Sequence, residues 1–258
     1  MLKVLILGGT SEARRLGQQL AADARFDALL SFAGRTESIA DPGVPYRVGG
    51  FGGIDGLCEH LRRERYGALV DATHPFAAQM SRHAASAAEL VRVPLARLEG
   101  PPWRPVAGDR WVEVATMAAA AAALGSDPCR VLCTVGRLEV GAFAAAPWHE
   151  YLVRAVDPFE PPLPRARVIA ARGPFCVDEE RALMEREHID VLVSKNSGTP
   201  STYAKIIAAR QLGVRVVMVC RPSLPAVTTL SAVSEAMVWL ERAWVEADHD
   251  ASTTKRGV

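Results

Sequence analysis

Short, continuous apolar runs alternate with amphipathic helical patterns along almost the whole chain. The first run, residues 4–7, is followed by a glycine turn and then by Ala13, Leu16 and Leu20 at the spacing of one helical face. Uninterrupted apolar runs are typical of strands that are buried on both faces of a parallel sheet. The pattern therefore predicts an α/β fold of parallel strands covered by helices. The predicted strands are residues 4–7, 28–33, 46–48, 68–72, 93–98, 130–135, 151–156, 167–171, 191–194 and 214–220.

The 258 residues divide into two sets of these units. Residues 100–105 are rich in proline and interrupt the alternation, so a domain boundary is expected near them. We therefore expect two Rossmann-like domains, each a mainly parallel sheet flanked by helices, with the active site in the cleft between them. The expected bounds are 1–100 for the N-terminal domain, 101–128 for a connecting segment, 129–246 for the C-terminal domain and 247–258 for a polar tail.

The composition is that of a soluble globular protein. Hydrophobic residues make up 49% of the chain, charged residues 23%, and the net charge is +1. Such a balance gives no overall attraction to nucleic acid or to a membrane surface. No apolar stretch approaches the ~20 residues of a membrane-spanning helix. The strand pattern begins at once, which leaves no room for a signal peptide. A cytoplasmic protein is therefore expected.

The cysteines and histidines show no pattern of a metal site or of a nucleophile. The five cysteines form no C-x-x-C pair and the six histidines no H-x-x-x-H pair, so neither a disulfide framework nor a bound metal is expected. The chain has no G-x-S-x-G motif, and no cysteine has an obvious base beside it in the sequence. Hydride transfer needs no such nucleophile, so a redox reaction stays open.

The turn after the first strand is a candidate phosphate-binding turn. Backbone N–H groups at a helix N-terminus attract phosphate. Aligned on the dinucleotide motif G-x-G-x-x-G, Thr10 and Ala13 take the second and third glycine positions, so the match is partial. The Thr10 hydroxyl is then expected to donate to a phosphate oxygen. The alternative is a turn that binds nothing. The residues concerned are Gly8, Gly9, Thr10, Ser11, Glu12 and Ala13.

The second predicted strand ends in a segment suited to a 2′-phosphate. Gly34, Arg35 and Thr36 lie where an NAD-binding domain has an acidic residue for the ribose 2′-hydroxyl. The guanidinium fork of Arg35 suits a 2′-phosphate instead, which favours NADP over NAD. The alternative is a solvated arginine in a loop.

The predicted strand 68–72 is followed by Thr73, His74, Pro75 and Phe76. Pro75 restricts His74 to an extended conformation. This segment is thereby held at the rim of the sheet, where a nicotinamide and its ribose would lie. His74 is a candidate proton donor. A histidine that only caps the next helix, or stacks on a cofactor, is the alternative.

Two turns of the second half are candidate substrate contacts. Lys195 ends a buried strand, where an ammonium group is costly unless it meets a negative group, so we expect it to bind substrate. The other residues of these turns, which suit an anion, are Gly136, Arg137, Asn196, Ser197 and Gly198. A cationic rim around the cleft is also expected from Arg97, Arg104, Arg154, Arg172 and Arg221, although each alone is typical of a surface charge.

Four motifs resemble those of the precorrin-6A reductases of cobalamin biosynthesis. They are LGGTSEAR at 7–14, AGRT at 33–36, DATHPFA at 71–77 and SKNSG at 194–198, and the similarity runs to about residue 245. The resemblance implies two Rossmann-type domains and an NADPH-dependent reduction of one double bond of the precorrin-6A macrocycle, which gives precorrin-6B. The substrate is then a polycarboxylate derived from a tetrapyrrole, and its charge suits arginine and lysine.

The resemblance also implies roles for single positions. Lys195 and His74 are the candidates for the donor of the proton that accompanies hydride. The loop VGGFGG at 48–53 has more glycine than a loop beside the adenosine requires, which leaves its role open. The cofactor positions are 8–13 for the pyrophosphate, 35–36 for the 2′-phosphate and 73–76 for the nicotinamide side. The macrocycle positions are Gly136, Arg137, Lys195 and Ser197.

Two other classes of protein share parts of the pattern. A non-catalytic NADP-binding sensor has the same first half, but it gives the turns TVGR and SKNSG no role. A methyltransferase wants an acidic residue after the second strand for the ribose hydroxyls of its cofactor, where this chain has Arg35. The resemblance fits a metal-free and a cobalt-bearing substrate equally. It is consistent with a monomer or small homo-oligomer that binds neither nucleic acid nor membrane.

Overall fold

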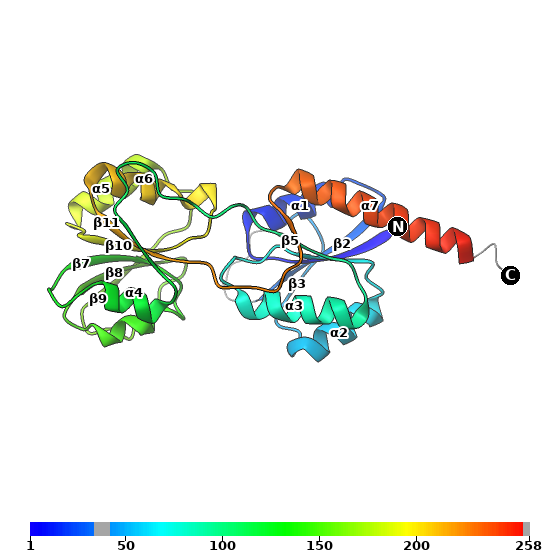
Figure 1. Ribbon diagram of the computed structural model, residues 1–258, viewed down its shortest axis with the longest axis horizontal. Helices are drawn as coiled ribbons and strands as arrows, with labels where there is room; N and C mark the ends of the chain where they lie inside the picture. The colour runs from blue at the N-terminus through cyan, green and yellow to red at the C-terminus, as the bar shows by residue number, and fades with distance from the viewer. Residues whose placement is uncertain (34–41, 255–258) are drawn as a thin grey trace. The chain divides into compact units, whose positions relative to one another are not determined.

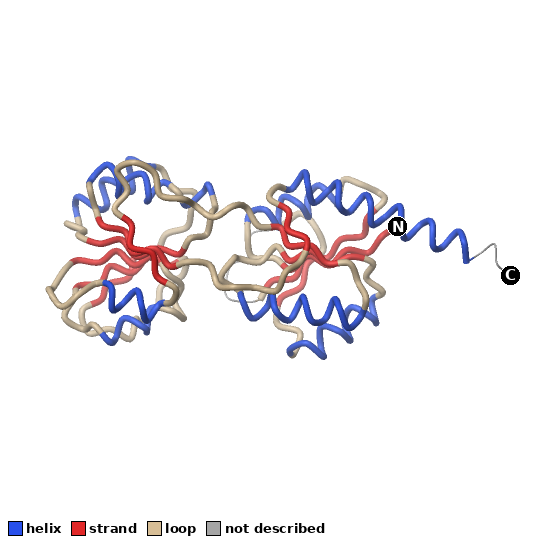
Figure 2. The backbone as a smooth tube through the Cα atoms, in the orientation of Figure 1, coloured by secondary structure: helices blue, strands red, loops and turns tan. Residues whose placement is uncertain are grey.

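The computed structural model describes residues 1–33 and 42–254, in two compact units. The first unit comprises Met1–Pro101 and Ser223–Val258, and the second comprises Pro102–Pro222. Each unit is built on a six-stranded, fully parallel sheet with helices on both faces (Figure 1, Figure 2). The predicted α/β fold class of two Rossmann-like domains is confirmed.

The first sheet has the strand order β12-β5-β4-β1-β2-β3. In its register Leu5 lies between Leu29 of β2 and Leu69 of β4. The strand order reverses between β1 and β4, and ligands of open α/β sheets bind at the carboxyl ends of the strands at such a point. The strands are β1 (Leu2–Leu7), β2 (Phe26–Phe32), β3 (Tyr46–Val48), β4 (Ala68–Asp71), β5 (Leu95–Leu98) and β12 (Thr228–Leu230).

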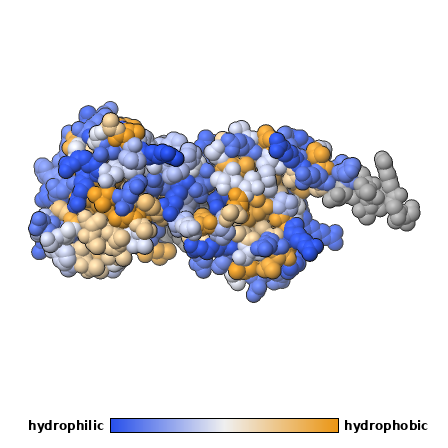
Figure 3. Space-filling view, viewed as in Figure 1, coloured by the Kyte–Doolittle hydropathy of each residue, from blue (hydrophilic) through white to orange (hydrophobic). Residues whose placement is uncertain are grey.

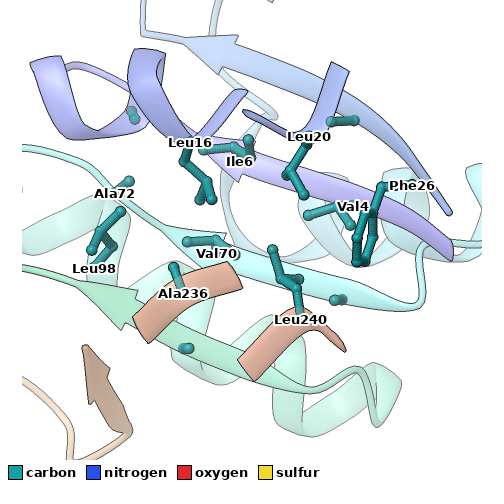
Figure 4. Packing of buried hydrophobic residues seen from close by; sticks show 14 of the residues in the cluster. Val4, Ile6, Leu16, Leu20, Phe26, Val70, Ala72, Leu98, Ala236 and Leu240 are labelled. Carbon is teal, nitrogen blue, oxygen red and sulfur yellow. The ribbon is translucent and has the colours of Figure 1, made fainter. Parts of the chain in front are cut away.

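Alternate residues of β1 face opposite sides of the first sheet, because successive side chains of a strand point in opposite directions. Val4 and Ile6 pack with helices α1 and α7, as Figure 4 shows. Leu5 and Leu7 pack on the other face, with α2 and α3. Both faces are therefore buried, as the apolar run predicts. The helices are α1 (Ser11–Ala21), α2 (Gly53–Glu64), α3 (Ala78–Val91) and α7 (Val233–Thr254).

The second sheet has the order β6-β11-β10-β7-β8-β9, and its order reverses between β7 and β10. Helices α5 and α6 pack on one face, where Met184 and Ile206 meet Leu132 and Leu192. Helix α4 lies on the other face (Figure 1). Figure 3 shows a pale orange area on the part of the second unit where Figure 1 places α4. The strands are β6 (Trp111–Val114), β7 (Arg130–Thr134), β8 (Glu150–Ala155), β9 (Ala166–Ala170), β10 (Val191–Lys195) and β11 (Arg215–Val219). The helices are α4 (Met117–Ala123), η1 (Val140–Ala145), α5 (Val177–Arg186), η2 (Pro200–Thr202) and α6 (Ala204–Leu212).

The two units exchange their sixth strands. After β5 the chain forms β6, which pairs with β11 of the second sheet, and after β11 it forms β12, which pairs with β5 of the first. Each sheet thereby completes the strand order 3-2-1-4-5-6, which is the order of dinucleotide-binding α/β domains.

This exchange corrects the domain bounds expected from the sequence. Residues 101–128 are not a connecting segment, because β6 and α4 lie in them and belong to the second unit. The chain from Ser223 onward returns to the first unit as β12 and α7, and α7 covers most of the expected tail. The sequence pattern missed β6 and β12 because both are short, partly exposed edge strands without an apolar run.

Within the described residues, no helix combines the length and the apolar character that a membrane crossing requires.

Candidate functional site

The turns after β1 and β4 are joined by one side chain at the switch point of the first sheet. Thr10 is the N-cap of α1, and its hydroxyl oxygen accepts the Ala13 N–H at 3.1 Å. The same hydroxyl donates its proton to the carbonyl oxygen of Ala72 at 2.8 Å. The expectation that Thr10 donates to a phosphate was wrong, because its single proton already holds the two turns together.

The backbone of this turn nevertheless fits a pyrophosphate. The N–H groups of residues 9–12 have no hydrogen-bond partner within the described part of the chain. They lie at the positive end of the α1 dipole, which favours an anion. Gly9 has a φ of +144°, which side chains rarely adopt, and a Cβ on Gly8 would come within 2.8 Å of Leu30 Cδ1. Glu12, the carboxylate in the first turn, is paired with Arg15 at 3.1 Å.

Replacing Thr10 by valine should cost more than the loss of an ordinary helix cap. The N-cap of α4, Thr116, makes the same bond to a backbone N–H, that of Ala119, and its substitution is the matched control. We expect Thr116→Val to lower the free energy of unfolding by about 1 kcal/mol. Thr10→Val should cost about 1 kcal/mol more, because the Ala72 carbonyl also loses its donor.

Urea unfolding of both variants measures the difference, and a titration with NADPH shows its effect on the site. Thr10→Val is expected to weaken NADPH binding and Thr116→Val to leave it unchanged. Equal behaviour of the two variants would contradict the role of Thr10 as the tie between the turns.

The turn after β4 is organised by Asp71, a residue to which the sequence analysis gave no role. Its Oδ1 accepts the Thr73 hydroxyl at 2.7 Å and the Thr73 N–H at 3.2 Å. Asp71 is 2% exposed and forms an ion pair with Arg97 of β5 at 3.5 Å. Arg97 also donates to the carbonyl of Pro225, just before β12. Thr73 therefore shapes the turn with its donors and does not offer them to a ligand.

His74 is held within the same turn. Its Nδ1 accepts the Phe76 N–H at 3.2 Å, and its carbonyl accepts the Ala77 N–H at 2.7 Å ahead of α3. The His74 and Phe76 rings contact each other, with centroids 5.8 Å apart. The geometry matches a turn-capping histidine. Because Nδ1 is an acceptor, a neutral ring carries its proton on Nε2.

The candidate 2′-phosphate residues Gly34, Arg35 and Thr36 lie outside the described residues. Arg47 of β3, which the sequence analysis missed, donates to Ser31 Oγ at 2.8 Å and stacks on the Phe51 ring at 4.1 Å. It therefore adds a cation near the end of β2. The glycines of 48–53 have a local cause, since Gly52 is the N-cap of α2 with a φ of +81°.

The strand-end lysine of the second sheet is paired within the chain. Lys195 Nζ lies 3.0 and 2.9 Å from the two carboxylate oxygens of Glu139. Glu139 also accepts the Gly136 N–H at 2.9 Å. The turns after β7 and β10 therefore meet, and Glu139 supplies the negative group beside Lys195. The sequence signal for this ion pair is a glutamate three residues after Gly136, and the sequence analysis did not use it.

The segment after β10 is fastened by its own side chains. The Asn196 amide accepts the Trp103 N–H at 2.8 Å and donates to the Trp103 carbonyl at 2.9 Å. Both polar atoms of the buried Asn196 side chain are used in this way, so its expected substrate contact loses its basis. Arg221 donates to the carbonyls of Asn196 and Ser197. Arg137 is exposed and makes no hydrogen bond or ion pair within the described residues.

Three of the five arginines expected to form a cationic rim hold the fold instead. Arg97 and Arg221 make the contacts given above, and Arg154 of β8 forms a buried bidentate pair with Glu180 of α5. A charge at the end of a buried strand is stabilised by an acid from a neighbouring element, which sequence spacing does not reveal. Arg104 and Arg172 are exposed.

One cysteine does have a base beside it, contrary to the expectation. Cys129 Sγ lies 3.2 Å from Nδ1 of His149, whose Nε2 faces the Gly125 carbonyl. Burial raises the pKa of Cys129 and lowers the pKa of His149, so both groups are neutral and the thiol is not activated. The pair is 20 residues apart, which is why adjacency in the sequence missed it. Among the described residues, no group of three or more potential ligands is placed to hold a metal ion.

Both sheets have the strand order 3-2-1-4-5-6. At the switch point of the first sheet lies a glycine turn whose N–H groups have no partner among the described residues. These features define a protein of the dinucleotide-binding α/β class. The chain also matches the family model described as precorrin-6x reductase CbiJ/CobK over residues 3–241. It belongs to this precorrin-6x reductase family.

Individual relatives agree over nearly the full length. The precorrin-6A reductase of Rhodobacter capsulatus is 46% identical, with 100% of both chains covered. The precorrin-6A reductase of a Sinorhizobium species is 47% identical over 91% of each chain. The solved structure of CobK precorrin-6A reductase superposes with a TM-score of 0.90 at 46% identity, covering 94% of this chain and 97% of that one.

Proposed function

We propose that this protein reduces one double bond of precorrin-6A with NADPH and gives precorrin-6B, as a step of cobalamin biosynthesis. The observation that carries the proposal is the turn after β1, in a chain of the precorrin-6x reductase family: four N–H groups of this turn have no partner among residues 1–33 and 42–254. The corresponding turn of the second unit is filled by Glu139. The protein should therefore bind one dinucleotide per chain, in its first unit.

The metal-free macrocycle is the preferred substrate in this proposal. Both relatives compared above are named for precorrin-6A. Carried over to this chain, the name implies that the substrate is a polycarboxylate macrocycle that holds no metal. The cytoplasmic location and the site between the two domains stay predictions.

The chain's own residues bind and orient the reactants. The N–H groups of residues 9–12 bind the pyrophosphate, and Arg35 and Thr36 bind the 2′-phosphate. The turn 73–76, held by Asp71, places the nicotinamide side. Bound NADPH supplies the hydride, and a proton must reach the second carbon of the double bond. The proton donors that fit the proposal are Nε2 of His74 and the ammonium group of Lys195.

The selectivity for NADPH rests on Arg35. Replacing Arg35 by alanine is expected to weaken NADPH binding by about 1.5–3 kcal/mol, because charged hydrogen bonds to the 2′-phosphate are lost. NADH has no 2′-phosphate, so its binding serves as the internal control. Fluorescence titration of the reduced nicotinamide measures both affinities, and equal losses for NADPH and NADH would remove the 2′-phosphate assignment.

The reaction itself is tested by anaerobic incubation of the purified protein with precorrin-6A and NADPH. We expect the absorbance of the reduced nicotinamide to fall with NADPH and much more slowly with NADH. Tight NADPH binding without oxidation, with precorrin-6A and with its cobalt form alike, would favour the NADP-binding sensor instead.

A further inference from the structure

Lys205, in the first turn of α6, is a buried lysine without a polar partner. The residue is 7% exposed, and its ammonium group makes no hydrogen bond or ion pair within the described residues. Nζ lies 5.6 Å from the centre of the Trp103 ring. Because Asn196 holds the Trp103 backbone directly after β10, the ammonium group lies near the carboxyl end of that strand. Ligands of open α/β sheets bind at this edge.

The charges around Lys205 do not balance. Arg154 pairs with Glu180 and Lys195 pairs with Glu139. Each glutamate uses both of its carboxylate oxygens. In the part of the chain that the structure describes, three cations therefore face two carboxylates, and Lys205 is the cation that has no carboxylate of its own. Burial and the charges of Arg154 and Lys195, opposed by Glu180, together lower the pKa of Lys205 to about 7. A third negative group at this place would stabilise the charged lysine.

A purely structural role explains this arrangement poorly. The cation–π contact with Trp103 offers only a small stabilisation. A lysine whose pKa falls this far loses more than that through burial, and methionine would fill the same space without the loss. The costly residue is best explained by an anion that arrives with a ligand.

We propose that Lys205 binds a carboxylate group of the substrate at the carboxyl edge of the second sheet. The inference rests on the proposed function, which supplies a polycarboxylate substrate. It adds to the macrocycle positions that the resemblance implies a binding residue that no sequence motif marks. No bond is made or broken at Lys205. Binding of the carboxylate draws one proton onto the ammonium group wherever the free enzyme holds Lys205 neutral.

Steady-state kinetics of Lys205→Met test the binding role. The substitution removes the charge and keeps an apolar stem of similar length. The matched control is the same change at Lys3, a half-buried lysine that pairs with Glu64 at 3.7 Å. We expect Lys205→Met to raise the KM for precorrin-6A by about 10-fold or more, the loss of one charged contact, with kcat changed by less than about 3-fold. The KM for NADPH should stay unchanged, and Lys3→Met should match the wild type.

Proton uptake on binding gives a readout that a structural role would not move. Calorimetric titration of the protein with precorrin-6A, at about pH 8.5 in buffers of different ionisation enthalpy, counts the protons taken up. The wild type should take up close to one proton more than Lys205→Met. Thermal melting of both proteins shows that each variant is folded.

The outcomes separate the two proposals. If the wild type oxidises NADPH with precorrin-6A while Lys205→Met has the same KM and the same proton uptake, the role of Lys205 is overturned and the proposed function stands. If the wild type shows neither binding nor oxidation, the proposed function fails and this inference fails with it. A raised KM together with lost proton uptake supports both.

Discussion

Replacing Arg154 by methionine should destabilise the protein by about 3–5 kcal/mol, because the carboxylate of Glu180 is then left buried without a partner. Glu180 is 1% exposed, and both of its oxygens face the guanidinium group. The Arg154 guanidinium also lies 4.1 Å from the Phe175 ring, so the substitution removes a second contact. Urea unfolding followed by circular dichroism measures the loss.

The double variant Arg154→Met, Glu180→Leu is the control for this prediction. Removing both charges leaves no unpaired group, so most of the lost stability should return. The size of the recovery separates the cost of an unpaired charge from the cost of altered packing. A double variant as unstable as Arg154→Met alone would contradict the assignment of the loss to Glu180.

Replacing Lys205 by methionine should change the free energy of unfolding in the opposite direction and should stabilise the protein. The pKa of Lys205 falls from 10.5 to about 7 on folding, because burial disfavours the charged form. Below pH 7 the group is charged in both states, and the folded state carries the full penalty, on the order of 5 kcal/mol. Between pH 7 and 10.5 the unfolded chain holds one proton more than the folded chain, so wild-type stability rises with pH. Above 10.5 the penalty is absent.

The difference in unfolding free energy between Lys205→Met and the wild type should therefore be largest near pH 6. It should shrink by about 1.4 kcal/mol per pH unit above pH 7. Lys3→Met, at a surface ion pair, should show almost no difference at any pH. Urea unfolding at several pH values gives the curve. A difference independent of pH would mean that Lys205 gains stability from packing alone.

The sequence predicted the fold class because β1 and β7, each beside a switch point, are continuous apolar runs. Such runs fit only a strand that is buried on both faces of its sheet. The turns after β7 and β10 meet because the two strands are parallel neighbours and end at one edge of the sheet. The exchange of β6 and β12 was missed. Short edge strands bury little apolar surface, so their pairing depends on tertiary structure and leaves no periodic pattern.

The sequence predicted which turns form the candidate site, but it did not predict what their side chains contact. Thr10, Thr73 and Asn196 have the residue types of ligand contacts, but the structure shows their hydrogen-bonding groups used within the chain. The partners of Thr10 and Asn196 lie far away in the sequence, which spacing does not reveal, whereas Thr73 is held by Asp71, two residues before it. Glu139 and Lys205 were missed for the complementary reason, because their roles depend on which charges pair with one another after folding.

The most direct test of the central claim is a single turnover of precorrin-6A with NADPH deuterated at the transferred position of the nicotinamide. Mass spectrometry of the macrocycle follows the reaction. The account predicts a product that carries one deuterium from the cofactor and one hydrogen from water, formed with NADPH far faster than with NADH. A macrocycle recovered unchanged, from protein shown to bind both NADPH and precorrin-6A, would contradict it.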